Sequence, residues 1–170
     1  MINKPANGEY NAFYQTYVSK IEKDDILEAL QDQAKEIPAL LNTISEEKSK
    51  YRYAEGKWTI AELLHHISDT ERIFAYRAFA IARGEKQSLP GMDQDEYANA
   101  AFTDNRTFES LVKEFSAVRA STLSFFETMD DSVVSNEGSA SGFPITVRGL
   151  AGIMAGHVAH HIDILKERYL

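Results

Sequence analysis

The sequence contains no cysteine among its 170 residues. This absence excludes disulfide bonds, thiolate metal ligands and a cysteine nucleophile, so a metal ion would have to be held by His, Asp or Glu. No run of residues approaches the roughly 20 apolar residues that a membrane span requires. The first residues, Met1 to Pro5, lack the apolar stretch of a secretory signal. These absences predict a cytoplasmic protein without a membrane partner.

Basic residues are the minority among the charged side chains. The chain has 18 Lys and Arg against 26 Asp and Glu, which gives a formal net charge of -8. Binding to a nucleic-acid backbone requires a clustered excess of Lys and Arg, so we expect no nucleic-acid partner. We also expect a small-molecule substrate. The length fits one compact domain. We therefore predict a single domain over residues 1–170, with an irregular or short-helical leader over residues 1–20.

Four long segments have apolar residues at helical spacing, and no segment favours a strand. The predicted helices cover about residues 24–44, 60–83, 106–129 and 147–169. Long loops precede the third helix and, rich in Ser and Gly, the fourth. Four helices of similar length, each with one apolar face, predict an all-α fold, a four-helix bundle.

The second helix has the clearest start in the sequence. Thr59 and Glu62 form the pattern of a capping box, in which the Thr hydroxyl accepts from a free N–H and Glu62 reaches back to the cap. Trp58 and Leu63 occupy the two positions of a hydrophobic staple. Gly84 is expected to end this helix.

All five histidines lie in two short stretches, at positions 65–66 and 157–161. His161 lies about 40° from His157 on the apolar face of the fourth helix, whereas His160 lies at the edge of that face. His66 flanks the apolar stripe of the second helix, and His65 points almost the opposite way. Two imidazoles four residues apart can converge on one ion. A single histidine on an apolar face is more often a hydrogen-bonded core residue, so spacing alone leaves both interpretations open.

Three motifs resemble those of the DinB/YfiT-like superfamily. They are Trp58–Glu62, His66–Glu71 and Gly156–His161, and the similarity extends over nearly the whole chain. The resemblance implies an up-down-down-up type of four-helix bundle that is commonly a homodimer. It also implies a divalent metal ion on three histidines.

Carried over to this chain, the metal ligands implied by the resemblance are His66, His157 and His161. His65 and His160 fall outside this set. His160 either orients a ligand or a substrate from behind the metal ligands or is exposed at the edge of its helix.

Three neutral imidazoles with an open fourth position are typical of a catalytic zinc site. Zinc is the first expectation, and nickel is also suited to nitrogen ligands. The resemblance implies either a thiol S-transferase that uses a low-molecular-weight thiol such as bacillithiol or mycothiol, or a metal-dependent hydrolase. We expect the transferase first. The remaining alternative is a non-catalytic protein whose metal ion only staples the helices of a dimer.

Asp69 is the candidate catalytic carboxylate, because it lies three residues after His66 and could accept a proton or brace a ligand. The alternative is an ion pair with Arg72 or Arg77. Glu71 is expected in a structural ion pair.

Two further features leave alternatives open. Arg148, in the first turn of the fourth helix, either meets an anionic substrate or lies on the surface. The aromatic group of the leader either covers a pocket, packs a dimer or belongs to the core; it consists of Tyr10, Phe13, Tyr14 and Tyr17.

Overall fold

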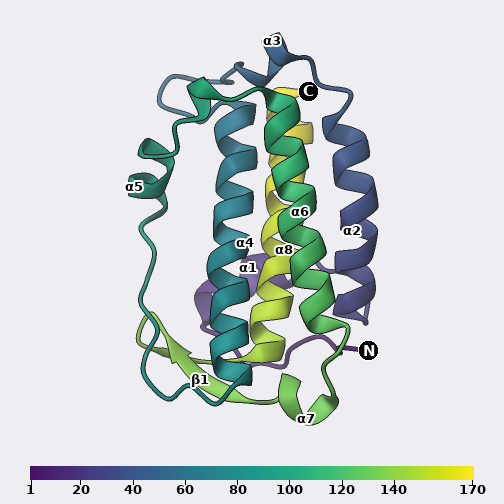
Figure 1. The fold of residues 1–170 in the computed structure, drawn as a ribbon, viewed down its shortest axis with the longest axis vertical. Helices are drawn as coiled ribbons and strands as arrows, with labels where there is room; N and C mark the ends of the chain where they lie inside the picture. Colours follow the sequence, from purple (N-terminus) through teal and green to yellow (C-terminus); the bar gives the residue numbers. More distant parts are fainter.

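Four long helices form the body of the protein in a computed structural model that describes residues 1–170. They are α2 (Ile26–Leu41), α4 (Ile60–Ala82), α6 (Phe108–Phe126) and α8 (Val147–Ile164). In Figure 1, α2 and α8 run upward, whereas α4 and α6 run downward. The predicted all-α four-helix bundle is therefore confirmed, with the up-down-down-up order that the resemblance implies. None of these helices combines the length and the apolar character needed to cross a lipid bilayer.

The predicted capping box of α4 is present. The backbone N–H of Glu62 donates to Thr59 Oγ1 at 3.1 Å, and the backbone N–H of Thr59 donates to Glu62 Oε2 at 2.7 Å. Two of the N–H groups left free at the helix start are thereby satisfied. The helix ends at Ala82, just before Gly84 with its positive φ of 88°. Local sequence signals thus set both ends of α4.

Short elements connect and flank the long helices. The leader contains a 3₁₀ turn η1 (Ala12–Tyr14) and the helix α1 (Gln15–Val18), which packs against α8. The other short elements are α3 (Glu46–Ser49), α5 (Gln94–Asn99), η2 (Thr103–Asn105) and α7 (Asp131–Val134). At the end of the chain α8 continues into a π-helical turn η3 (Leu165–Tyr169).

The expectation that the chain has no strand is wrong for the segment before α8. Strands β1 (Glu137–Ala140) and β2 (Phe143–Thr146) pair antiparallel, with Ala140 opposite Phe143. Ser141 and Gly142 between them both have positive φ, 53° and 81°, as tight two-residue hairpin turns require. The hairpin lies against α4, where a Cβ on Gly138 would come within 2.6 Å of Ile81. Ser and Gly in this segment hide the apolar alternation by which a strand is recognised.

A layer of polar side chains divides the core. One cluster contains 20 buried apolar residues and the other contains 15. The layer contains His66 and His157 and a hydrogen-bonded group in which Arg119 of α6 donates to Glu71 of α4 and to Gln33 of α2. Gln33 in turn donates to the carbonyl of Ala155 in α8. The four helices therefore meet at mid-length through hydrogen bonds and histidines rather than through apolar contacts alone.

Three glycines of α8 allow the leader to approach the helix backbone closely. They are Gly149, Gly152 and Gly156, spaced along one face. A Cβ on Gly156 would lie 2.2 Å from the carbonyl oxygen of Tyr17, a distance at which the two backbones could not stay in place. This contact fixes Tyr17 beside the next residue of α8, His157.

Candidate metal centre

The three predicted ligands meet between α4 and α8. Nε2 of His157 lies 3.1 Å from Nε2 of His66 and 3.0 Å from Nε2 of His161. All three side chains are buried, with 5%, 4% and 8% of their surface exposed for His66, His157 and His161. They are the group of side chains whose ligand atoms are close enough together to share an ion.

Burial keeps the three imidazoles neutral. It lowers the pKa of His66 to about 4 and, together with the neighbouring imidazoles, the pKa of His161 to about 3. Burial and the other histidines also hold the pKa of His157 well below its usual value. A neutral imidazole has one nitrogen lone pair available for a metal. All three rings can therefore act as ligands at neutral pH.

The donor set fits a divalent cation. Zn–N bonds of about 2.0 to 2.1 Å place tetrahedral nitrogen ligands about 3.3 Å apart. This is close to the distances from Nε2 of His157 to Nε2 of His66 and Nε2 of His161. Without an ion, Nε2 of His157 could donate one proton to only one of its two neighbours. Converging neutral nitrogens are therefore better satisfied by a cation than by one another.

Thr70 is a neighbour of the cluster that the sequence analysis did not single out. Its Oγ1 lies 3.4 Å from Nδ1 of His66, one helical turn earlier on α4. A proton on Nδ1 leaves the Nε2 lone pair free toward the cluster. Nδ1 of His161, by contrast, is buried without a hydrogen-bond partner. The spacing of four residues after a candidate ligand was the signal that could have identified Thr70.

Aromatic rings support two of the histidines. The ring of Trp58 lies 4.6 Å from that of His66, and Tyr17 packs edge-on against His157 at 5.3 Å between ring centroids. Trp58 is fixed in turn by its carbonyl, which accepts a hydrogen bond of 2.7 Å from the Tyr169 hydroxyl. The imidazoles are thus held by packing as well as by their helices.

Cavities lie on two sides of the histidines. One of about 260 Å³ is lined by His66 and His157, and another of about 260 Å³ is lined by His161. Gln94 of α5 lines both. The cluster is therefore buried but accessible from two directions.

The leader forms one wall of the first cavity. Phe13, Tyr14 and Tyr17 all line it, which is the pocket-covering arrangement considered for this aromatic group. Tyr10 does not take part, because it is buried and its hydroxyl donates to Gln15 at 2.8 Å.

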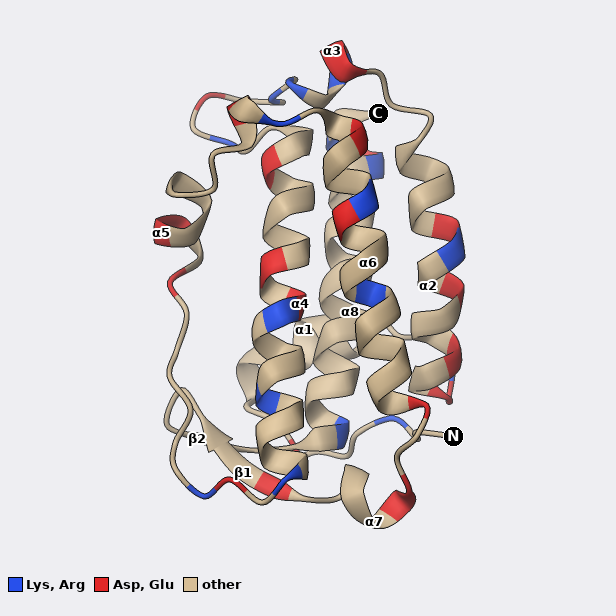
Figure 2. Ribbon diagram, in the orientation of Figure 1, with Lys and Arg blue, Asp and Glu red and all other residues tan.

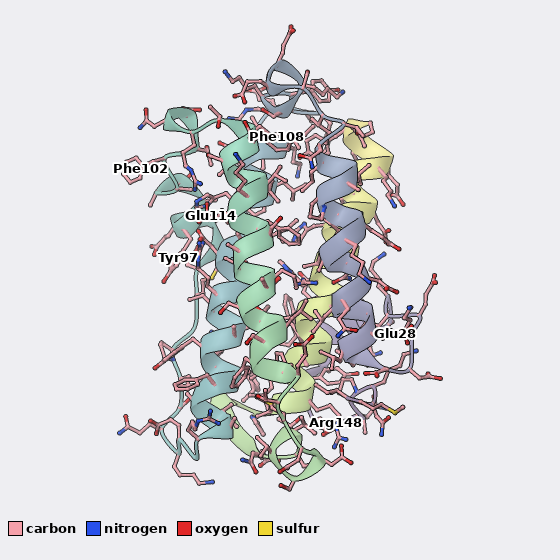
Figure 3. All side chains as sticks on the ribbon, turned by 45° about the vertical axis from the view of Figure 1, so that its right-hand side comes forward. Glu28, Tyr97, Phe102, Phe108, Glu114 and Arg148 are labelled. Atoms are coloured by element: carbon pink, nitrogen blue, oxygen red, sulfur yellow. The ribbon has the colours of Figure 1, made fainter.

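Asp69 is engaged outside the cluster. Its carboxylate lies 3.1 Å from Nδ1 of His65 and accepts a hydrogen bond of 3.0 Å from Arg72. Burial raises the pKa of Asp69, but the hydrogen bond from His65 and the charge of Arg72 together outweigh this effect, so the net shift of the pKa is downward. Arg72 also bonds Glu114, labelled on α6 in Figure 3. This arrangement matches the ion-pair alternative, and a catalytic role for Asp69 stays a prediction.

His160 and Arg148 also lie outside the three-histidine cluster. His160 is half-buried with its ring 5.1 Å from that of Tyr17, and burial and Lys20 lower its pKa against the opposite effect of Asp163. Its role behind the ligands stays a prediction. Arg148, labelled near the start of α8 in Figure 3, pairs with Glu9 at 2.9 Å.

Glu71 forms the structural ion pair expected of it. Both of its oxygens accept hydrogen bonds of 2.8 Å from Arg119. Arg119 itself is fully buried and also donates to the carbonyl of Leu30 and to Gln33. No sequence pattern predicted that this arginine would be buried.

Comparison with known proteins finds relatives along most of the chain. Residues 29–165 match the model of the DinB superfamily. A protein of Oceanobacillus iheyensis named "Putative metal-dependent hydrolase" is 24% identical over 155 residues, which cover 86% of this chain and 87% of the relative. A protein of the same name from Bacillus pumilus is 28% identical over 149 residues, with 83% of each chain covered.

Two solved structures share the fold. YfiT from Bacillus subtilis, described as a "probable metal-dependent hydrolase with an unusual four-helix bundle topology", superposes with a TM-score of 0.68 at 16% identity and covers 96% of this chain and 90% of its own. The mycothiol-dependent maleylpyruvate isomerase superposes with a TM-score of 0.65 at 13% identity, covering 86% of this chain and 62% of that one. At such identities the likeness establishes the fold alone.

Proposed function

The chain belongs to the DinB superfamily, and from this membership and the three-histidine cluster we propose that it is a metal-dependent thiol S-transferase. His66, His157 and His161 hold the divalent ion, zinc first and nickel as the alternative. The substrates are a low-molecular-weight thiol and a small electrophile. The observation that carries the proposal is the convergence of three neutral, buried imidazoles beside cavities on two sides.

The chain's own residues provide the ligand set. A divalent ion bound there supplies a Lewis acid that lowers the pKa of a thiol or a water molecule. Thr70 keeps the Nε2 lone pair of His66 directed to the cluster. Trp58 and Tyr17 exclude bulk water from the rings that they cover.

The carboxylates of α4 are all engaged, which removes them as the general base that hydrolysis requires. Hydrolysis usually requires a general base beside the attacking water. Glu71 is bound by Arg119, Asp69 by His65 and Arg72, and Glu62 by the helix cap. Thiol transfer has no such requirement: the thiol loses its proton to solvent, and the sulfur bonds to an electrophilic carbon. The leaving group departs with its bonding electron pair.

Hydrolysis is the second candidate, because both curated relatives carry the name of a metal-dependent hydrolase. In that case Asp69 would have to leave its surface partners or act through an intervening water. We also propose that the protein is a homodimer and that it is cytoplasmic. Light scattering of the purified protein tests the dimer.

Metal analysis followed by a thiol titration tests the proposal. We expect about one divalent ion per chain, and a visible spectrum of the cobalt-substituted protein that shifts when bacillithiol is added. The protein should conjugate an electrophile such as chlorodinitrobenzene only with the thiol present. His161→Ala should show neither the spectral shift nor the conjugation. Ester hydrolysis without thiol would favour the second candidate. A bound ion that no thiol, anion or water analogue perturbs would favour the non-catalytic metal staple.

A further inference from the structure

Two arginines of the bundle are buried, and their surroundings differ. Arg119 is 0% exposed and forms two hydrogen bonds of 2.8 Å with the carboxylate of Glu71. Its Nη1 donates to the carbonyl of Leu30 and to the side chain of Gln33. The charge of Arg119 is therefore fully compensated inside the protein, as burial of an ion demands.

Arg77 is 4% exposed and has no carboxylate partner. Its Nη2 donates to the carbonyl of Pro90 at 2.6 Å and lies 3.5 Å from Oγ of Ser141. The guanidinium has five N–H donors, and those on Nε and Nη1 meet no acceptor of the protein. A nearly buried cation is thus left without a counter-ion.

The guanidinium faces cavity space rather than packed core. Arg77 lines the cavity of about 260 Å³ that reaches His66 and His157, and also an adjoining one of about 300 Å³ under the β1–β2 hairpin. Phe13, Tyr14 and Ser141 line both cavities, so the two spaces adjoin along the same wall.

Neither cavity has an acidic lining, although the chain has 26 Asp and Glu. Arg77 is the only side chain with a permanent charge in either lining. In Figure 2, acidic residues mark short elements such as α3, α5 and α7. A cavity that is positive in an acidic protein attracts anions selectively.

The separation of His66 and Arg77 on α4 sets the length that a ligand needs to contact both. His66 and Arg77 are eleven residues apart, which is close to three turns, so they share one face of the helix with Thr70 and Phe74 between them. Eleven residues correspond to a rise of about 16 Å, and the Arg77 side chain leans back toward the start of the helix. A ligand that touches both ends must therefore carry its charge several bonds from its reacting atom.

We propose that Arg77 determines specificity by binding a carboxylate or phosphate-type group of an extended ligand whose other end reaches the three histidines. The inference deepens the proposed function and depends on it for the identity of the reacting end. Arg77 is a binding residue, and the ligand's anion replaces the missing counter-ion. Two ligands share this chemistry: the thiol itself, if it carries a carboxylate, and the second substrate.

Binding of matched neutral and anionic probes to the purified protein tests this role. Phenylbutyrate and phenylbutanamide have the same shape and differ in charge. We expect phenylbutyrate to bind at least tenfold more tightly by calorimetry, with metal-loaded and with metal-depleted protein alike. Arg77→Gln should abolish this preference, and Arg77→Lys should keep part of it, because a point charge replaces a bidentate donor. Equal binding of the two probes by the wild-type protein would overturn the proposal.

Arg72→Gln is the matched control. It removes the same charge from α4, but Arg72 lies in the surface network with Asp69 and Glu114, so the preference should persist. A preference lost equally in Arg72→Gln and Arg77→Gln would reduce the effect to net charge and contradict the proposal. Thermal unfolding of each variant verifies that it is folded.

A second pair of probes identifies which ligand carries the anion. Mercaptohexanoate and mercaptohexanol are added to the cobalt-substituted protein, and the spectral shift reports binding of the sulfur. A tenfold weakening of the acid alone in Arg77→Gln assigns the anionic group to the thiol. An unchanged thiol titration together with a lost phenylbutyrate preference assigns it to the other substrate. Absence of any spectral shift contradicts thiol transfer but leaves the phenylbutyrate result standing.

Discussion

Nε2 of His66 and Nε2 of His157 lie 3.1 Å apart although 91 positions separate the two residues in the chain. The contact joins two antiparallel helices, α4 and α8, at the polar layer that divides the core. It is held on one side by Thr70 and Trp58 and on the other by Tyr17. These contacts orient the two imidazoles toward each other.

His161→Ala should abolish stoichiometric binding of zinc while the bundle stays folded. Two nitrogens remain, which is too few for a stable site, whereas the two apolar clusters are untouched. Elemental analysis and circular dichroism measure the two properties. His65→Ala, outside the cluster, is the control and should bind the metal as the wild type does. Unfolding of the protein on metal removal would indicate a structural ion instead.

Thr70→Val should weaken metal binding by roughly 10- to 100-fold without loss of the fold. Valine keeps the shape but removes the oxygen beside Nδ1 of His66, so the ring orientation and tautomer are no longer held. Competition with a chromophoric chelator measures the affinity. Thr70→Ser retains the hydroxyl and should restore most of it; equal affinities for all three proteins would exclude this role.

Glu71→Gln should lower the free energy of unfolding by about 3 to 5 kcal/mol, because Arg119 then keeps its charge in the core without a compensating carboxylate. Urea denaturation provides the measurement. Glu109→Gln breaks the exposed pair with Lys113 and should have no measurable effect. The double variant Glu71→Leu with Arg119→Met should be less destabilised than Glu71→Gln; a greater loss would show that the pair itself is net stabilising.

Gly156→Ala should destabilise the protein even though alanine is the better helix former by about 1 kcal/mol. The new methyl group would meet the backbone of Tyr17 at 2.2 Å, and the leader would have to move away from α8. Because Tyr17 packs on His157, metal affinity should fall as well. Gly84→Ala, where nothing lies within 4 Å but φ is positive, should lower stability without changing metal affinity.

The metal-free protein should lose stability as the pH falls from about 6.5 toward about 4. Burial lowers the pKa of His66 from 6.5 to about 4 and that of His161 to about 3. In this range the unfolded chain therefore binds protons that the folded protein does not, and the free energy of unfolding decreases. Thermal melts in the presence of EDTA at several pH values measure it. His161→Leu should show a shallower decrease, and an equal slope would contradict the assignment.

The residues of α4 show how far prediction from sequence reached. Its capping box and its end before Gly84 followed from neighbouring residues alone. The i, i+4 pair in α8 was equally local, whereas the ligand role of His66 came from its helix face and from the family resemblance. The β1–β2 hairpin was missed because its Ser- and Gly-rich strands lack apolar alternation and are stabilised by packing on Ile81.

The sequence by itself determined the helices, their apolar faces and the candidate ligands, because helix caps and the period of 3.6 residues act over a few positions of the chain. Only the tertiary structure decided which faces meet. Arg119 and Arg77 both lie on long helices, yet Arg119 pairs with Glu71 whereas Arg77 faces a cavity. That difference depends on how four helices and a leader pack together, which no local pattern specifies.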